Sequence, residues 1–198
     1  MGRARQPQKP VGQSGGLDAV QRAFDLFQQG RARAAMRELA PVLDNPQTPQ
    51  VELKARRLQG ACLQREGFHE EAAQQLGKAT ALDGRDAQVR FDWAQALQFA
   101  GKIDESERVV REMLSQAPEH AGGTALLARL LQSRGRHDEA AALLDEAGGR
   151  GIEDPALTLA LAGSARRLGR EQEAIERLDA LATQASLPAG QRQEALFQ

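Results

Sequence analysis

Small and large apolar residues recur along this chain at fixed distances from five glycines. The position five residues after each glycine is small, and the positions nine and twelve residues after it are apolar. These offsets correspond to i, i+4 and i+7, which form one face of an α-helix. Charged residues such as Glu70, Glu105 and Glu173 occupy other faces. Each glycine is therefore expected to precede an amphipathic helix. The five glycines are Gly30, Gly67, Gly101, Gly135 and Gly169.

A second pattern precedes each glycine. The residue seven positions before it is always Ala or Gly, and the residue four positions before it is Leu in four cases and Ala165 in the fifth. The sequence therefore predicts a repeated unit of helix, glycine turn and helix. Glycine suits such a turn because the end of the first helix commonly needs a residue with positive φ. Small residues suit the helix contact because they let two helix axes approach closely.

The spacing of the glycines predicts five such units. The last four glycines are 34 residues apart, and the first lies 37 residues before the second. Helix-breaking residues stand near the ends of units, for example Pro46 and Pro118. A repeat array is the architecture that such a period indicates. We expect a basic, disordered arm over residues 1–16 and a partial helix over 187–198, either a cap or the start of a sixth repeat. The five units are expected at about 17–49, 53–86, 87–120, 121–154 and 155–186.

The pattern resembles the tetratricopeptide repeat (TPR) family. The 34-residue period, the small residue before the turn, the G-x-x-x-x-A step and Pro118 at the end of a unit all match that family. The tryptophan that opens a typical unit is replaced here by Arg56, Arg90 and Thr124. The resemblance covers about residues 17–186. It implies an all-α fold, a right-handed superhelical solenoid of antiparallel helix pairs.

Composition narrows the classes of partner. The chain has 26 Lys and Arg against 27 Asp and Glu, a net charge of −1. Duplex nucleic acid selects for a clear excess of basic residues, so we expect no nucleic-acid partner. No apolar run approaches the length of a transmembrane helix, and the N-terminus lacks the apolar stretch of a secretory signal. We therefore expect no membrane partner and a cytoplasmic location.

Catalytic and metal-binding motifs are weak. The segment GQSGG satisfies G-x-S-x-G around Ser14, but it lies in a Gly/Gln-rich stretch rather than between a strand and a helix. His69, His120 and His137 form no HExxH pairing, and Cys62 is the one cysteine. The sequence predicts no enzyme activity, no cofactor and no metal site.

The family resemblance implies a concave groove lined by the first helix of each unit. The corresponding positions lie about 13, 10, 6 and 3 residues before each glycine, and they hold four Lys or Arg but no Asp or Glu. Such a groove would suit a partner with acidic and apolar side chains. Ordinary solvated helix residues are the alternative interpretation. The candidate groove residues are Phe24, Phe27, Lys54, Arg57, Gln64, Phe91, Gln95, Gln98, Arg129, Gln132 and Arg166.

The sequence thus favours a protein-protein interaction scaffold that binds an extended peptide or partner segment. The alternative is the N-terminal TPR region of a larger enzyme, since some bacterial sulfotransferases join degenerate TPR units to a catalytic domain. A helical-repeat RNA-binding protein is disfavoured by the neutral charge and the 34-residue period. Apolar residues of the last unit, Ile175, Leu178 and Leu181, predict self-association through the C-terminal end.

Overall fold

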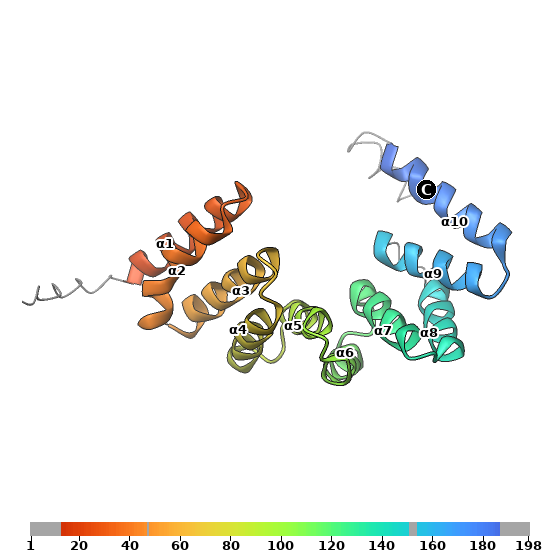
Figure 1. Cartoon of the computed structure of the whole chain (residues 1–198), viewed down its shortest axis with the longest axis horizontal. Helices are drawn as coiled ribbons and strands as arrows, with labels where there is room; N and C mark the ends of the chain where they lie inside the picture. The colour runs from red at the N-terminus through yellow and green to blue at the C-terminus, as the bar shows by residue number, and fades with distance from the viewer. Residues whose placement is uncertain (1–12, 47, 151–153, 187–198) are drawn as a thin grey trace, which may run out of the picture. The chain divides into compact units, whose positions relative to one another are not determined.

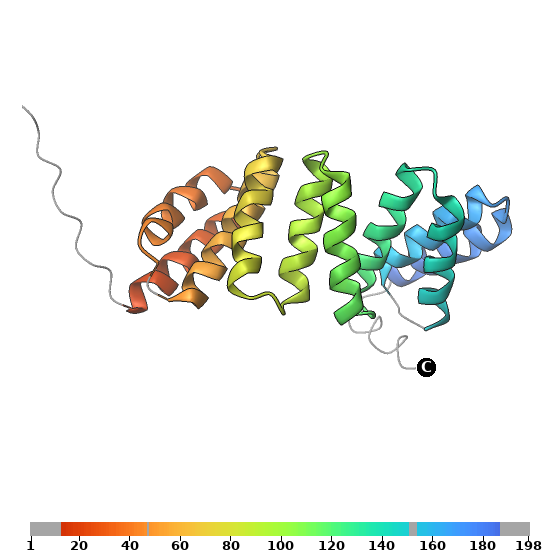
Figure 2. The ribbon, with the colours of Figure 1, turned by 90° about the horizontal axis from the view of Figure 1, so that it is seen from below.

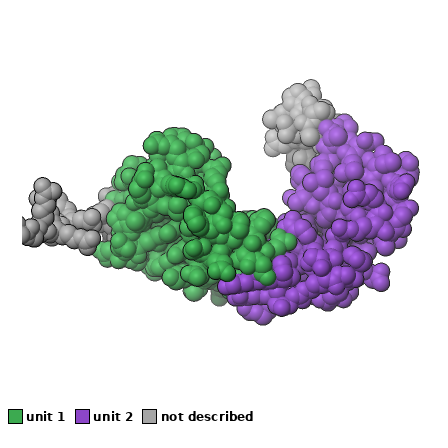
Figure 3. All heavy atoms as spheres, viewed as in Figure 1, with its two compact units in different colours: residues 1–101 green, residues 102–198 purple. Residues whose placement is uncertain are grey.

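The computed structural model describes residues 13–46, 48–150 and 154–186, and these residues form ten α-helices (Figure 1). The chain divides into two compact parts, each larger than a single repeat, which we call unit 1 (residues 1–101) and unit 2 (residues 102–198) (Figure 3). The helices of unit 1 are α1 (Gln13–Gln28), α2 (Ala32–Asp44), α3 (Pro49–Arg65), α4 (His69–Leu82) and α5 (Ala87–Phe99). The helices of unit 2 are α6 (Ile103–Gln116), α7 (Ala121–Ser133), α8 (His137–Gly149), α9 (Pro155–Arg167) and α10 (Glu171–Ser186).

Successive helices pack against each other within each unit (Figure 2). In unit 1, α1 packs on α2, α2 on α3, α3 on α4 and α4 on α5. In unit 2 the same holds from α6 to α10. First helices of neighbouring pairs also meet, since α1 contacts α3 and α7 contacts α9. The predicted all-α fold of helix pairs joined by glycine turns is confirmed.

The small positions predicted from the sequence are buried where two helices meet. Ala35, Ala72 and Ala140, each five residues after a glycine, are completely inaccessible to solvent. Gly60 shows why the position before the turn must be small, because a Cβ built there would lie 2.6 Å from Cγ of Leu76. Since a side chain cannot occupy that space, α3 approaches α4 more closely than a larger residue would allow.

Helix α10 departs from this pattern of burial. Leu144 of α8 is fully buried, whereas the equivalent Leu178 of α10 is 42% exposed and Ile175 is 51% exposed. Leu144 belongs to a helix on which α9 packs, but no helix follows α10 among the described residues. Residues 187–198, predicted to form a partial helix, lie outside the described part of the chain.

All five repeat glycines adopt the left-handed conformation, with φ between 73° and 83°. At the first turn the N–H of Gly30 donates to the carbonyl of Phe27, and the N–H of Arg31 donates to the carbonyl of Leu26, both at 2.9 Å. These two bonds form the Schellman motif that satisfies the last carbonyls of a helix. The predicted role of the glycines is confirmed.

The first and second helices of a repeat begin differently. The side chains of Thr48, Asp86, His120 and Asp154 accept hydrogen bonds from the backbone N–H groups that open α3, α5, α7 and α9. Helices α4, α6 and α8 follow the glycine turns and have no such side-chain cap, but each carries two acidic residues in its first turn. Acidic side chains there stabilise the positive end of the helix dipole. These seven helix starts are therefore stabilised locally, whereas α2 has neither a side-chain cap nor an acidic residue in its first turn.

Helix α1 begins earlier than the sequence analysis expected. The predicted arm covered residues 1–16, but residues 13–16 belong to α1. Gly12 to Gly16 had suggested a linker because glycine disfavours helix interiors. Residues 1–12 lie outside the described residues.

Replacing Ala140 by Phe should lower the free energy of unfolding by about 1–3 kcal/mol, because the ring has no space at a fully buried helix contact. The matched control is Ala142→Phe, two residues further along α8 at an exposed position. Urea unfolding followed by circular dichroism measures both. Equal losses for the two variants would contradict the assignment of the packed face.

Replacing Gly135 by Ala should cost about 1–2 kcal/mol, because φ at this residue is +74° and an L-residue is strained there. Gly163 lies within α9, where an added Cβ meets nothing within 4 Å. Gly163→Ala should therefore stabilise the chain by about 0.5–1 kcal/mol through helix propensity. Thermal unfolding should shift in opposite directions for the two substitutions. A shift of the same sign in both would disprove the backbone argument.

Candidate functional site

Unit 1 has a hollow of about 460 Å³ on its first helices α1, α3 and α5. Large apolar and basic side chains line it together. We call it the phenylalanine hollow, after two aromatic residues on α1. Its lining residues are Val20, Gln21, Phe24, Phe27, Lys54, Arg57, Leu58, Ala61 and Asp92.

The two phenylalanines of this hollow differ in their contacts. The guanidinium of Arg65 lies 4.6 Å from the ring centroid of Phe27, and its Nη1 donates to the carbonyl of Phe27 at 2.7 Å. This cation–π contact and hydrogen bond hold Phe27 in place. Phe24 remains 44% exposed. It therefore offers an apolar surface that a partner could cover.

An ion pair balances the charge of Arg57 within the same hollow. Its Nη2 lies 3.1 Å from Oδ2 of Asp92, and its Nη1 lies 3.7 Å from Oδ2 of Asp86. Asp92 follows Phe91 directly and was absent from the candidate positions, so the sequence analysis missed this carboxylate. The phenylalanine hollow is therefore less basic than the pattern of candidate positions suggested.

Unit 2 has a second hollow, of about 290 Å³, on its first helices α7 and α9. Three arginines and no Asp or Glu line it, and we call it the arginine hollow. Nη1 of Arg167 donates a hydrogen bond to Oε1 of Gln132 across the two helices. The lining residues are Ala125, Arg129, Gln132, Ala156, Leu159, Ala160, Gly163, Arg166 and Arg167.

The two hollows gather most of the candidate groove residues. Four of them, on α1 and α3, line the phenylalanine hollow, and Arg129, Gln132 and Arg166 line the arginine hollow. Gln64, Phe91, Gln95 and Gln98 line neither. Arg167 was missed because the offsets sample one residue per turn, whereas an exposed helical face is wide enough to include its neighbour.

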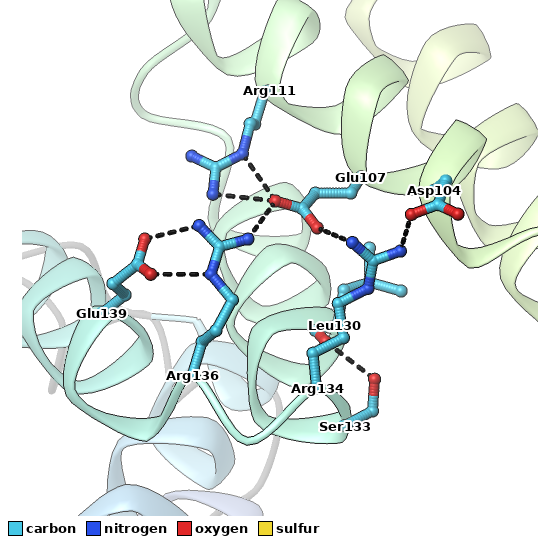
Figure 4. Close-up of polar contacts among 8 residues, drawn as sticks. All are labelled: Asp104, Glu107, Arg111, Leu130, Ser133, Arg134, Arg136 and Glu139. Carbon is cyan, nitrogen blue, oxygen red and sulfur yellow. Dashed lines mark hydrogen bonds and ion pairs between the residues drawn. The ribbon is translucent and has the colours of Figure 1, made fainter.

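A separate cluster of charges surrounds Glu107 of α6 (Figure 4). Its side chain is only 10% exposed and accepts hydrogen bonds from Arg111, Arg134 and Arg136, at 2.9, 3.0 and 2.9 Å. Arg134 also pairs with Asp104, and Arg136 pairs with Glu139. Arg134 and Arg136 flank the glycine turn between α7 and α8, so the cluster ties that turn to α6. It has a structural role outside both hollows.

The arginines determine the ionisation of Glu107. Burial alone would raise the pKa of its carboxyl, but hydrogen bonds from Arg111 and Arg136 outweigh it, and the pKa is lowered. A carboxyl with a lowered pKa stabilises the fold above its ordinary pKa near 4.5, and that contribution is lost as pH falls through the lowered value. Glu107 is therefore ionised at neutral pH.

Other chemistry is sparse in the described part of the chain. Burial raises the pKa of the Cys62 thiol to about 11, so the thiol stays protonated at neutral pH. No cluster of three or more His, Cys, Asp or Glu side chains in residues 13–46, 48–150 and 154–186 could hold a metal ion. None of the ten helices combines the length and apolar character needed to cross a membrane.

Comparison with known proteins identifies the repeat. Residues 100–151 match the tetratricopeptide repeat family model. No curated protein sequence matches the chain.

Solved structures show the same fold. MamA from Desulfovibrio magneticus, residue 41 to its end, superposes with a TM-score of 0.68 at 14% identity, over 87% of this chain and 96% of that one. A thermophilic TPR protein from Thermus thermophilus gives 0.67 at 20% identity, over 91% and 96%. PilF of Pseudomonas aeruginosa gives 0.71 at 18% identity, over 85% and 75%. The chain has the TPR fold, and these comparisons give the sulfotransferase alternative no support.

Replacing Glu107 by Gln should lower the free energy of unfolding by about 1–3 kcal/mol, because the three arginines lose the charge of the nearly buried carboxylate that they surround. The control is Glu112→Gln on the same helix, since Glu112 is 55% exposed and its pair with Arg108 at 4.0 Å should be worth less than about 1 kcal/mol.

The stability difference between wild type and Glu107→Gln depends on pH. The difference between wild type and Glu107→Gln should persist at neutral pH and shrink as pH falls below about 4.5, because the carboxyl is then protonated first in the unfolded chain and, at still lower pH, in the folded chain. Urea unfolding across this pH range measures it. A difference that does not change with pH would mean that the charge of Glu107 is not what stabilises the cluster.

Proposed function

We propose that this TPR chain is a protein-protein interaction scaffold that holds a segment of a partner protein against its first helices. The observation that carries the proposal is the placement of the two hollows. Each is lined only by first helices, α1, α3 and α5 in unit 1 and α7 and α9 in unit 2. The TPR fold supports a protein partner in general, and the two hollows are the surfaces on which we expect that partner to bind.

Exposed apolar side chains in the hollows support binding of a protein segment. Phe24 is 44% exposed and Leu159 is 54% exposed, so a partner could bury the remaining surface of both side chains. Burying a fully exposed side chain of this size contributes on the order of 1.5–3 kcal/mol, and covering a half-exposed one contributes about half of that. Polar groups around them, such as Lys54 and Gln132, could bond to the carbonyls or carboxylates of the bound segment.

The hollows also fit a segment better than a compact small molecule. A typical small-molecule site encloses most of its ligand in a single cavity. Here the same kind of surface occurs in both units, on helices related by the repeat. A protein partner can use each of these surfaces separately, because its segments carry side chains of several kinds.

The test uses the purified chain as bait in a lysate of the organism that encodes it, with quantitative mass spectrometry of the retained proteins. Phe24→Glu and Leu159→Glu place a charge in each hollow. Their controls are Phe68→Glu and Leu168→Glu, since Phe68 is 45% and Leu168 is 42% exposed and neither lines a hollow.

We expect a specific partner that wild type and both controls retain, and whose capture falls by about tenfold or more when a hollow residue is replaced, as expected if about 1.4 kcal/mol of binding is lost. Circular dichroism must show that all four variants remain helical. Equal capture by the four folded variants would place the binding surface elsewhere and contradict the proposal.

A further inference from the structure

The lining of the arginine hollow contains arginines and no carboxylate. These arginines are Arg129, Arg166 and Arg167. Arg167 bonds to the neutral amide of Gln132, which positions the guanidinium and leaves its charge unchanged. In the phenylalanine hollow, by contrast, Arg57 faces the lining carboxylate of Asp92. The two hollows therefore differ in the charge that they present to a ligand.

An apolar surface lies beside these arginines. Leu159 is 54% exposed, and three alanines, Ala125, Ala156 and Ala160, line the hollow with it. Gly163 lines the same hollow, and a Cβ built there meets no atom within 4 Å. The hollow therefore has open space beside Leu159, and its volume of about 290 Å³ is at the small end for ligand sites.

We propose that the arginine hollow binds a segment of a partner protein in which an aliphatic side chain lies close to two or more carboxylates. The aliphatic side chain packs on Leu159 in the space over Gly163, and the carboxylates pair with Arg166 and Arg167. Arginine suits this role because its planar fork of N–H donors matches both oxygens of a carboxylate. The proposal rests on the proposed function and names the chemistry of the occupant.

A phosphate backbone could also pair with these arginines, but the hollow lacks the other half of a nucleic-acid site. Single-stranded nucleic acid is held by aromatic side chains on which its bases stack. No Phe, Trp or His lines the arginine hollow, and the chain has a net charge of −1. An apolar wall next to the cations suits an aliphatic side chain better than a base or a sugar.

The first experiment selects ligands from a random peptide library displayed on phage, with three baits. These are the wild-type chain, Arg166→Glu in the hollow, and Arg108→Glu on α6. Arg108 is 64% exposed and does not line the hollow. Arg108→Glu therefore changes the net charge by the same amount as Arg166→Glu but leaves the hollow intact. Wild type and Arg108→Glu should enrich peptides with several Asp or Glu around an aliphatic residue. Arg166→Glu should lose that enrichment.

The second experiment measures the affinity of the most enriched peptide by fluorescence anisotropy. Gly163→Phe should fill the hollow and weaken binding by about tenfold or more, without lowering the melting temperature, since the backbone is helical and the space is open. Gly149→Phe is the control, because a Cβ there also meets nothing within 4 Å and Gly149 lies outside the hollow. Replacing the acidic residues of the peptide by their amides should also weaken binding about tenfold.

Several results would overturn the inference. They are a library that enriches no acidic peptides, acidic enrichment that survives in Arg166→Glu, and a peptide that binds Gly163→Phe as tightly as wild type. Tighter binding of a labelled oligouridylate than of the peptide, lost in Arg166→Glu, would assign the hollow to nucleic acid instead.

These results are separable from the test of the proposed function. A partner whose capture depends on Leu159, together with a library that selects no acidic peptides, would leave the scaffold function standing and refute the acidic occupant. Alternatively, acidic peptides could bind at Arg166 while Phe24→Glu and Leu159→Glu leave partner capture from the lysate unchanged. That result would support the acidic occupant of the hollow and refute the broader scaffold function.

Discussion

Close contact between helices at residues with almost no side chain is the interaction on which the rest of this structure depends. Ala35, Ala72 and Ala140 have no solvent exposure, and a Cβ at Gly60 would lie 2.6 Å from Cγ of Leu76. Each contact holds a second helix against its first helix and buries the larger apolar residues between them. First helices then lie next to first helices, as α7 does to α9, and the hollows form where they meet. The candidate site is thus a consequence of how the pairs pack.

Repetition explains why much of this could be predicted from the sequence alone. A single Ala or Gly carries little information, but a small residue at the same distance from each of five glycines indicates a helix contact and a turn. Individual partners could not be predicted in the same way. Arg57 and Asp92 belong to different pairs and are 35 residues apart, so no local pattern connects them. The helical start of α1 at Gln13 was missed because glycine-rich composition outweighed the weak apolar pattern there. The exposure of Ile175 and Leu178 matches the apolar surface that the sequence analysis expected on the last repeat.

Two groups of arginines in unit 2 lie in different surroundings, although the net charge of −1 conceals this difference. Arg134 and Arg136 surround the buried carboxylate of Glu107 and fasten the turn after α7. Arg166, in the same position relative to its own glycine as Gln132 is to Gly135, lies in a hollow without acidic lining. A charge total for the chain cannot distinguish the two groups because it ignores which arginines are already surrounded by carboxylates. Position in the repeat separates them, since one group follows the first helix and the other lies on its exposed face.

The five repeat glycines are required because glycine accepts a positive φ, not because it is small. A Cβ built on any of them meets no atom within 4 Å, yet each holds φ between 73° and 83°. An L-residue is strained at this φ, whereas its mirror image favours it. A D-alanine at Gly135 would therefore have an unstrained backbone in the turn and would also restrict the unfolded chain. Among the twenty genetically encoded residues only glycine is free of this preference for one hand, so substitution at these five positions is limited by chirality even where the surrounding space is open.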